Sequence, residues 1–245
     1  MDPDTALGKI RKLLAMAEAE GLTEQARESY NDKAADLIAQ YGIDRALLEE
    51  AAPTRAVAGD VVLDIDRPYA RDKIMLLGSI AGPLGCRLVH RTQLLPGATA
   101  HAAHLFGMAA DLERTQLLYT SLLVQQAHAL ALVEVPRSQD PRAFRRSWMA
   151  GFAAAVQFRL TRAETLARDS RERADAGGPT HSVALVLADR MARVEQHVAD
   201  TYPRLRPMRS RQLSGSGAPA GFQAGQRADI GTGNRVARQP RHREL

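Results

Sequence analysis

The 245-residue sequence contains a single cysteine, Cys86, and few aromatic residues. One cysteine excludes an intrachain disulfide and a cluster of thiolate metal ligands, and it fits a reducing cytoplasm. Aromatic residues make up only 4% of the chain, although apolar residues as a whole make up 45%. A core built mainly from Ala, Leu and Val favours packed helices over a sandwich of β-branched and aromatic strands. We therefore expect a predominantly α-helical α+β protein.

The sequence also lacks a secretory leader and long hydrophobic runs. Its first residues, MDPDTALGKI, do not combine a basic segment with an apolar run. No uninterrupted apolar stretch approaches the roughly 18 residues that a membrane span requires. These features predict a soluble, cytoplasmic protein without membrane contact.

Positive charge is distributed unevenly along the chain. The formal net charge is +5, and residues 204–245 carry nine arginines against Asp229 and Glu244, a net of +7. Residues 1–203 therefore carry about −2 by difference. The same C-terminal segment is rich in Gly, Ser and Pro and has few large apolar side chains, so burial cannot offset its ordering entropy. We expect residues 204–245 to form a disordered basic tail.

The N-terminal segment KIRKLLAMAEAEGLTEQARESYNDKAADLIAQYGID predicts two helices joined by a short turn. Apolar side chains recur at helical spacing in both halves, so the two stripes can bury each other. Gly21 separates the helices. Gly42 is expected to end the second one in the left-handed conformation that glycine adopts readily. Residues 1–52 are thus predicted to form a helical hairpin domain.

Three features of this segment carry a resemblance to a known family. They are the pattern KIRKLLAMA, the acidic start of the second helix near Glu24, and the ending AADLIAQYGID. Together they resemble the domain of unknown function 2786, found in bacterial and phage proteins. The LFG segment and the Gly- and Arg-rich end are similar to the region that follows this domain in actinobacterial members. The resemblance implies no activity, and Lys9 and Lys12 are either phosphate contacts or solvated side chains.

The remainder of the chain predicts a helix-rich α+β domain over residues 60–203. Short runs bounded by turn residues predict a β-hairpin, which a helix must cover because a two-stranded ribbon is marginal alone. The helix that starts at Met108 is the candidate cover. The expected elements are a short strand or linker over 60–66, a helix over 71–81, hairpin strands over 86–91 and 103–107, and helices over 108–133, 142–174 and 183–199.

Histidines near the predicted hairpin suggest a metal site. His90, His101 and His104, with Asp111, supply ligand types that zinc accepts. His101 and His104 are three residues apart, however, which on a strand sends their side chains to opposite faces. Packing or surface roles are therefore the favoured interpretation, and we expect no metal or other cofactor.

Other segments could also carry chemistry. Cys86 would need a neighbouring histidine to act as a nucleophile, and its place at the start of an apolar strand favours a buried thiol instead. GSGAPAG has the spacing of neither a nucleophile elbow nor a phosphate loop, so we expect a flexible segment. Arg142, Arg145 and Arg146 crowd the first turns of a long helix, where its dipole favours anions, and form either a phosphate site or a solvated face.

The basic tail suggests nucleic acid as a partner. Dense guanidinium groups attract phosphate without reading bases, so binding would be non-specific and salt-dependent. The use of 29 Arg against four Lys also fits a GC-rich genome, in which a disordered tail drifts toward arginine. The candidate nucleic-acid-binding residues are Arg204, Arg206, Arg209, Arg211, Arg235 and Arg238.

We predict a non-catalytic accessory factor that binds nucleic acid non-specifically through this tail. A protein–protein interaction module is the first alternative. A hydrolase or metal-dependent enzyme of unknown substrate is the second. The sequence leaves the oligomeric state open.

Overall fold

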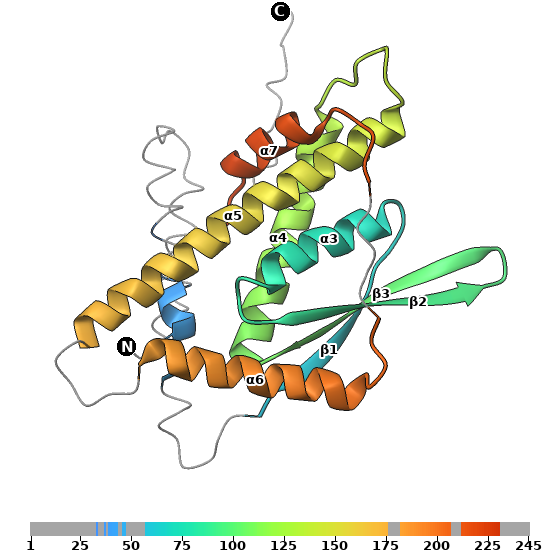
Figure 1. Cartoon of the computed structure of the whole chain (residues 1–245). Helices are drawn as coiled ribbons and strands as arrows, with labels where there is room; N and C mark the ends of the chain where they lie inside the picture. The colour runs from blue at the N-terminus through green and yellow to red at the C-terminus, as the bar shows by residue number, and fades with distance from the viewer. Residues whose placement is uncertain are drawn as a thin grey trace, which may run out of the picture.

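The computed structural model shows a small antiparallel sheet surrounded by helices (Figure 1), which confirms the predicted α+β class with helices predominating. The described residues are 33, 37, 39–43, 46–47, 57–175, 182–206 and 212–230. The elements are β1 (Gly59–Asp64), α3 (Ala70–Ala81), β2 (Arg87–Leu95), β3 (Ala98–Gly107), α4 (Ala109–Ala131), α5 (Pro141–Asp175), α6 (Val183–Thr201) and α7 (Ala218–Arg227). Over these residues, no helix is both long enough and apolar enough to cross a membrane.

The sheet has the order β1-β3-β2, with both neighbours antiparallel to the central strand. The segment predicted as a strand or linker is therefore a strand. β1 pairs with β3 only as far as Asp64 opposite Ala102, whereas β2 and β3 continue together to Leu95 opposite Ala98. The two-residue turn between them contains Gly97, whose φ of 71° favours glycine. The far end of the hairpin thus extends beyond the third strand (Figure 1).

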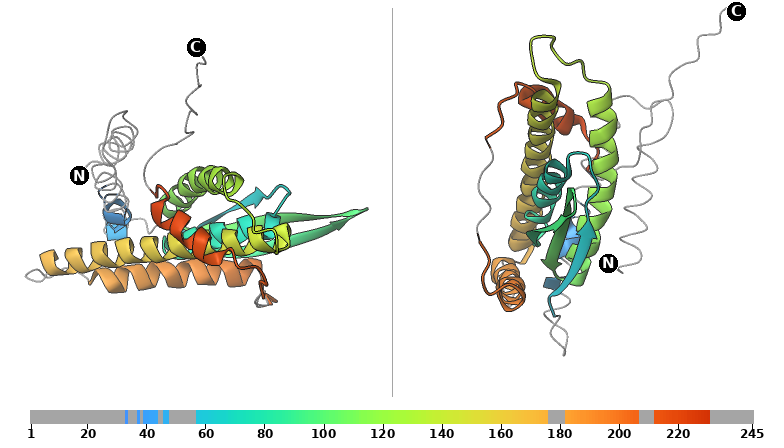
Figure 2. Two further views of the ribbon diagram at one scale, coloured as in Figure 1. Left: turned by 90° about the horizontal axis from the view of Figure 1, so that it is seen from above. Right: turned by 90° about the vertical axis from the view of Figure 1, so that its right-hand side faces the viewer.

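The two faces of the sheet pack on different helices because successive side chains on a strand alternate in direction. Ala103 and Leu105 of β3 face the main core, which includes residues of α3, α4 and α5. Phe106 and Val89 face the other way and pack against Val194 and Val198 of α6. Helices cover both faces, as Figure 2 shows from two sides. α3, α4, α5 and α6 agree with the predicted helices to within a few residues.

The prediction that residues 204–245 are disordered is wrong for residues 212–230, which contain α7. This helix lies along α5 (Figures 1 and 2), and Ala228 and Ile230 after it are buried in the main core. Gly217, Gly221 and Gly225 follow one another at intervals of four, which lets the backbones approach. A β-carbon at Gly221 would lie 2.7 Å from the carbonyl carbon of Trp148 in α5. Backbone contact replaces the large apolar side chains that the segment lacks. The expectation of a flexible segment at GSGAPAG is therefore wrong, because its last four residues begin the packed helix α7.

The N-terminal hairpin of residues 1–52 lies mostly outside the described residues. Residues 39–43 are helical, and Ala39 and Ile43 are buried against Ala167 and Val183. The expected left-handed end at Gly42 is wrong, because this glycine lies within the helical segment. Its missing side chain instead makes room for the guanidinium of Arg114.

Candidate functional site

An exposed feature of the described residues is the part of the β2–β3 hairpin that extends past β1. We call residues 91–101 the arm. All side chains from Arg91 to Ala98 are exposed. At the tip, Leu94 is 86% and Leu95 is 45% exposed. Edges and apolar tips of this kind are ready contact surfaces for another molecule.

The arm and its surroundings are rich in cations. The sequence contains no Asp or Glu between Asp72 and Asp111. Arg91 lies on the arm, and Arg67 reaches it by donating to the carbonyl oxygen of Thr99 at 2.9 Å. Arg71 is exposed on the first turn of α3. Within the described part of the chain, no carboxylate forms an ion pair with these three arginines. They are therefore available to an external anion.

Two histidines lie at the root of the arm on the main-core face. Nε2 of His90 and Nδ1 of His101 share a hydrogen bond of 3.0 Å, and the rings are stacked. Burial lowers the pKa of both imidazoles. The neighbouring His101 and Arg71 lower the pKa of His90 further, and Arg67 and Arg71 do so for His101. Burial is the larger cause of both pKa shifts, and the nearby cationic groups add to it.

A second polar cluster lies on the α6 side of the sheet. Asp60 accepts from Nε2 of His104 at 2.8 Å and from Nε2 of His197 at 2.7 Å. Nδ1 of His104 lies 2.7 Å from the hydroxyl oxygen of Tyr202, which follows α6. The hydrogen bond from His104 lowers the pKa of Asp60 most, and the one from His197 lowers it further.

The order of hydroxyl, imidazole and carboxylate in this cluster is that of a nucleophile, its base and an orienting group. Phe106 fills the space between the rings, with its centroid 4.3 Å from that of His104 and 5.3 Å from that of His197. We therefore assign the cluster to fixing α6 on the sheet.

The residues of the metal hypothesis are in three places: His90 and His101 together, His104 here, and Asp111 in the interior. As expected, His101 and His104 face opposite sides. Nowhere in the described ranges do three or more His, Cys, Asp or Glu side chains form a group that could hold a metal ion.

The interior contains a network of buried charges that joins three helices. Asp111 accepts from Arg114 at 2.8 Å and from Arg190 of α6 at 3.0 Å. Arg114 also donates to Glu164 of α5 at 3.1 Å. Burial raises the pKa of Glu164 to about 7, although the attraction of Arg114 opposes this shift. The network connects the three helices through side chains that are at most 20% exposed.

Cys86 lies near this network. Its Sγ accepts from the Thr115 hydroxyl at 3.5 Å, and burial raises the pKa of the thiol to about 12. The predicted burial of this cysteine is confirmed, and a thiol that stays protonated is a poor nucleophile.

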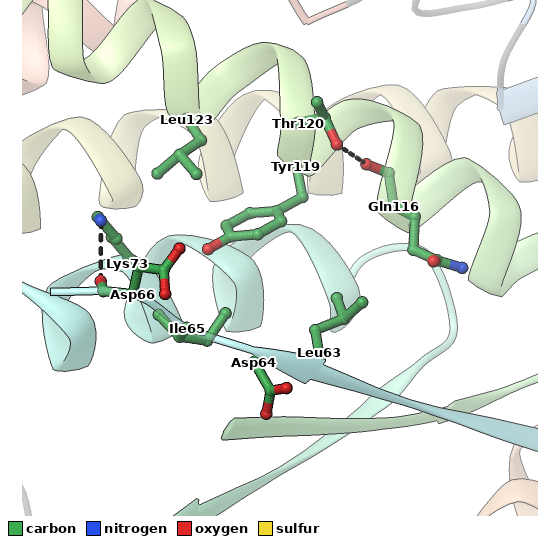
Figure 3. Close-up of a pocket in the computed structure, with 9 residues that line it drawn as sticks. All are labelled: Leu63, Asp64, Ile65, Asp66, Lys73, Gln116, Tyr119, Thr120 and Leu123. Atoms are coloured by element: carbon green, nitrogen blue, oxygen red, sulfur yellow. Dashed lines mark hydrogen bonds between the residues drawn. The ribbon is translucent and has the colours of Figure 1, made fainter. Parts of the chain in front are cut away.

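A pocket of about 230 Å³ lies between the end of β1, α3 and α4 (Figure 3). Asp64, Asp66 and Lys73 line it together with apolar side chains, and Lys73 donates to the carbonyl oxygen of Asp66 at 2.9 Å. The two carboxylates disfavour a phosphate there. Tyr119 forms part of the wall, but its hydroxyl is itself buried.

The residues predicted to bind nucleic acid are placed only in part. Arg204 and Arg206 are exposed in the segment after α6. Arg209, Arg211, Arg235 and Arg238 lie outside the described residues. Of the arginines that crowd the start of α5, Arg146 lies 3.8 Å from the buried Asp72, whereas Arg142 and Arg145 are exposed.

The arginines around the arm were missed from sequence. Arg67 and Arg71 are 24 and 20 residues from Arg91 along the chain. The long stretch without acidic residues was the signal that could have pointed to them.

Comparison with curated proteins and with solved structures found no match to this chain. Residues 5–45 match the family model described as Protein of unknown function (DUF2786), which confirms the resemblance seen in the N-terminal motifs.

Proposed function

We propose that this protein binds nucleic acid non-specifically and that the arm is its main contact surface. The observation that supports this most is the projecting ribbon with Arg67, Arg71 and Arg91 around it, none of them paired to a described carboxylate. A two-stranded ribbon is narrow enough to enter a groove of duplex DNA. Cations along the ribbon would then lie beside the phosphates.

Nucleic acid remains the proposed partner, but its principal contact surface is now the arm and not the C-terminal tail. Arg204 and Arg206 form a secondary cationic segment, and the remaining tail arginines stay a prediction. Phosphate contacts supply affinity without sequence information. Each phosphate neutralised on B-DNA contributes about 0.9 to the slope of log affinity against log salt concentration. Three arginines should therefore account for a slope of about 2.7.

Binding of a fluorescent, mixed-sequence DNA duplex, followed by anisotropy across a salt series, tests the proposal. The informative variant is Arg67→Gln/Arg71→Gln/Arg91→Gln. The matched control is Arg137→Gln/Arg162→Gln/Arg227→Gln, which removes the same charge from exposed positions elsewhere. We expect the first variant to bind more weakly and to lose about 2.7 from the slope, while the control keeps most of it.

Three results would contradict this proposal. Equal losses in both variants would mean that net charge alone attracts DNA. Loss of binding only after removal of residues 204–245 would return the site to the tail. Absence of binding at low salt would favour the alternative of a protein-interaction module, which the exposed Leu94 and Leu95 also support.

A further inference from the structure

We propose that the tip of the arm inserts Leu94 and Leu95 between base pairs of duplex DNA and kinks the duplex from its minor groove. This inference rests on the proposed function, since it needs the arm to lie on DNA. It adds a mode of binding and a substrate class, which the cations alone do not specify.

The tip is apolar on both faces of the ribbon. Leu94 and Leu95 are consecutive, so their side chains point to opposite faces, and the exposed Pro96 follows them in the turn. Their cross-strand partners are Thr99 and Ala98, which are small. Such small partners leave Leu94 86% and Leu95 45% exposed. Apolar wedges of Leu or Pro are the side chains with which architectural proteins unstack a base step.

The length of the arm fits the depth of a groove. Four residues separate Arg91, at the root, from Leu95, at the tip, which spans about 13 Å at the rise of an antiparallel strand. The minor groove is about 7.5 Å deep. The tip therefore reaches the base edges while Arg91 is still level with the backbone. Arg71 lies beside His90 and His101 at the root, and Arg67 donates to the carbonyl oxygen of Thr99 nearer the tip, so both are placed to meet phosphates along the arm.

The charge and polarity of the arm favour duplex DNA over other possible partners. The partner must be anionic at the root and apolar at the tip, which describes phosphates outside and stacked bases inside. A second copy of the chain paired along the arm would bring like charges together, which is unfavourable. Duplex RNA has a wide, shallow minor groove and a deep, narrow major groove, which do not offer the same fit.

The test uses the full-length chain and a DNA duplex with donor and acceptor dyes at its ends and 2-aminopurine at a central TA step. The wild type should raise both the energy transfer and the 2-aminopurine fluorescence, because a kink of roughly 20–90° shortens the end-to-end distance and unstacks the step. Leu94→Ala/Leu95→Ala should abolish both signals and weaken binding about tenfold. Its salt slope should stay unchanged, since no charge is removed.

The matched control is Leu117→Ala/Leu185→Ala, which removes two exposed leucines from helices away from the arm. It should bend DNA like the wild type. Circular dichroism checks that both variants fold.

Several outcomes overturn the insertion. It is wrong if the tip variant still kinks DNA, or if the wild type binds with normal anisotropy but without a 2-aminopurine signal. In that second case the proposed function survives. If DNA causes no anisotropy change, both the insertion and the proposed function are wrong. A wild-type dimer in sedimentation that the tip variant dissociates would assign the leucines to self-association instead, and equal unstacking of an RNA duplex would exclude the minor-groove mode.

Discussion

Gly42 lies directly against the guanidinium of Arg114, so that a β-carbon on this glycine would be 2.5 Å from Cζ. The contact connects the N-terminal segment that carries the family motifs with the charge network of α4, α5 and α6. Arg114 has no room to retreat, because it is buried and holds Asp111 and Glu164. Glycine is therefore needed at this position of the Tyr-Gly-Ile motif because Arg114 of α4 packs directly against its backbone.

Gly42→Ala should destabilise the protein by about 1–3 kcal/mol, the usual range for overpacking a filled interior. In a free helix the same change would stabilise by up to about 1 kcal/mol, so the sign distinguishes the two situations. Urea denaturation followed by circular dichroism measures the change.

Gly78→Ala is the control for this prediction. Gly78 lies within α3, and a β-carbon there would meet nothing within 4 Å. It should be neutral or stabilising by up to about 1 kcal/mol. A Gly42→Ala protein as stable as the Gly78→Ala protein would show that the contact with Arg114 is not tight.

Gly221→Ala should undock α7 from α5. The new β-carbon would meet the backbone of Trp148, which cannot move without shifting α5. We expect faster hydrogen exchange over residues 218–227 and a loss of about 1–3 kcal/mol. Gln223→Ala changes an exposed position on the same helix and should leave exchange unchanged. Unaltered protection in Gly221→Ala would contradict the close approach of the two backbones.

The contrast between α7 and the other helices shows what could be predicted from sequence. α3 to α6 carry periodic Leu, Ile, Val and Phe side chains, which reveal a buried face locally. α7 buries its glycines against α5, and this stabilisation appears only when both helices are considered. Its composition therefore resembled that of a disordered tail.

The candidate site could not be predicted from the sequence for a related reason. The hairpin could be predicted from its flanking runs, but the predicted strands cover only 86–91 and 103–107, with a loop in place of the ladder that continues to Leu95 and Ala98. The extent of the arm could not be predicted, because it depends on where β1 stops pairing. Arg67 and Arg71 join Arg91 only after the chain has folded around α3, whereas counting charge along the chain emphasised residues 204–245.

Tyr119→Phe should stabilise the protein by about 1 kcal/mol. The Tyr119 hydroxyl is buried, and none of the described residues forms a hydrogen bond with it. An unsatisfied buried hydroxyl costs about 1–3 kcal/mol, and phenylalanine keeps the ring without this penalty. The pKa of Tyr119 is raised to about 12 by burial, in keeping with an apolar environment. Thermal unfolding should show a midpoint about 2–4 °C higher. A lower midpoint would mean that the hydroxyl has a partner.

Glu164 should make the stability of the protein depend on pH between about 4.5 and 7. Burial raises the pKa of its carboxyl to about 7 from an ordinary value of 4.5. Over this interval the folded state holds a proton that the unfolded state has released, so stability falls as pH rises and levels off above pH 7. Arg114 favours the ionised form and Asp111 the protonated one, which makes both part of the same equilibrium.

Glu164→Gln keeps the shape of the side chain and removes its titration. Urea midpoints measured at pH 5, 6, 7 and 8 should therefore vary less in this variant than in the wild type. Glu172→Gln, at another position on α5, is the control and should keep the wild-type profile. A wild-type stability that rises from pH 5 to 7, with the rise lost in Glu164→Gln, would show instead that the ion pair with Arg114 outweighs burial and holds the pKa of Glu164 below its ordinary value.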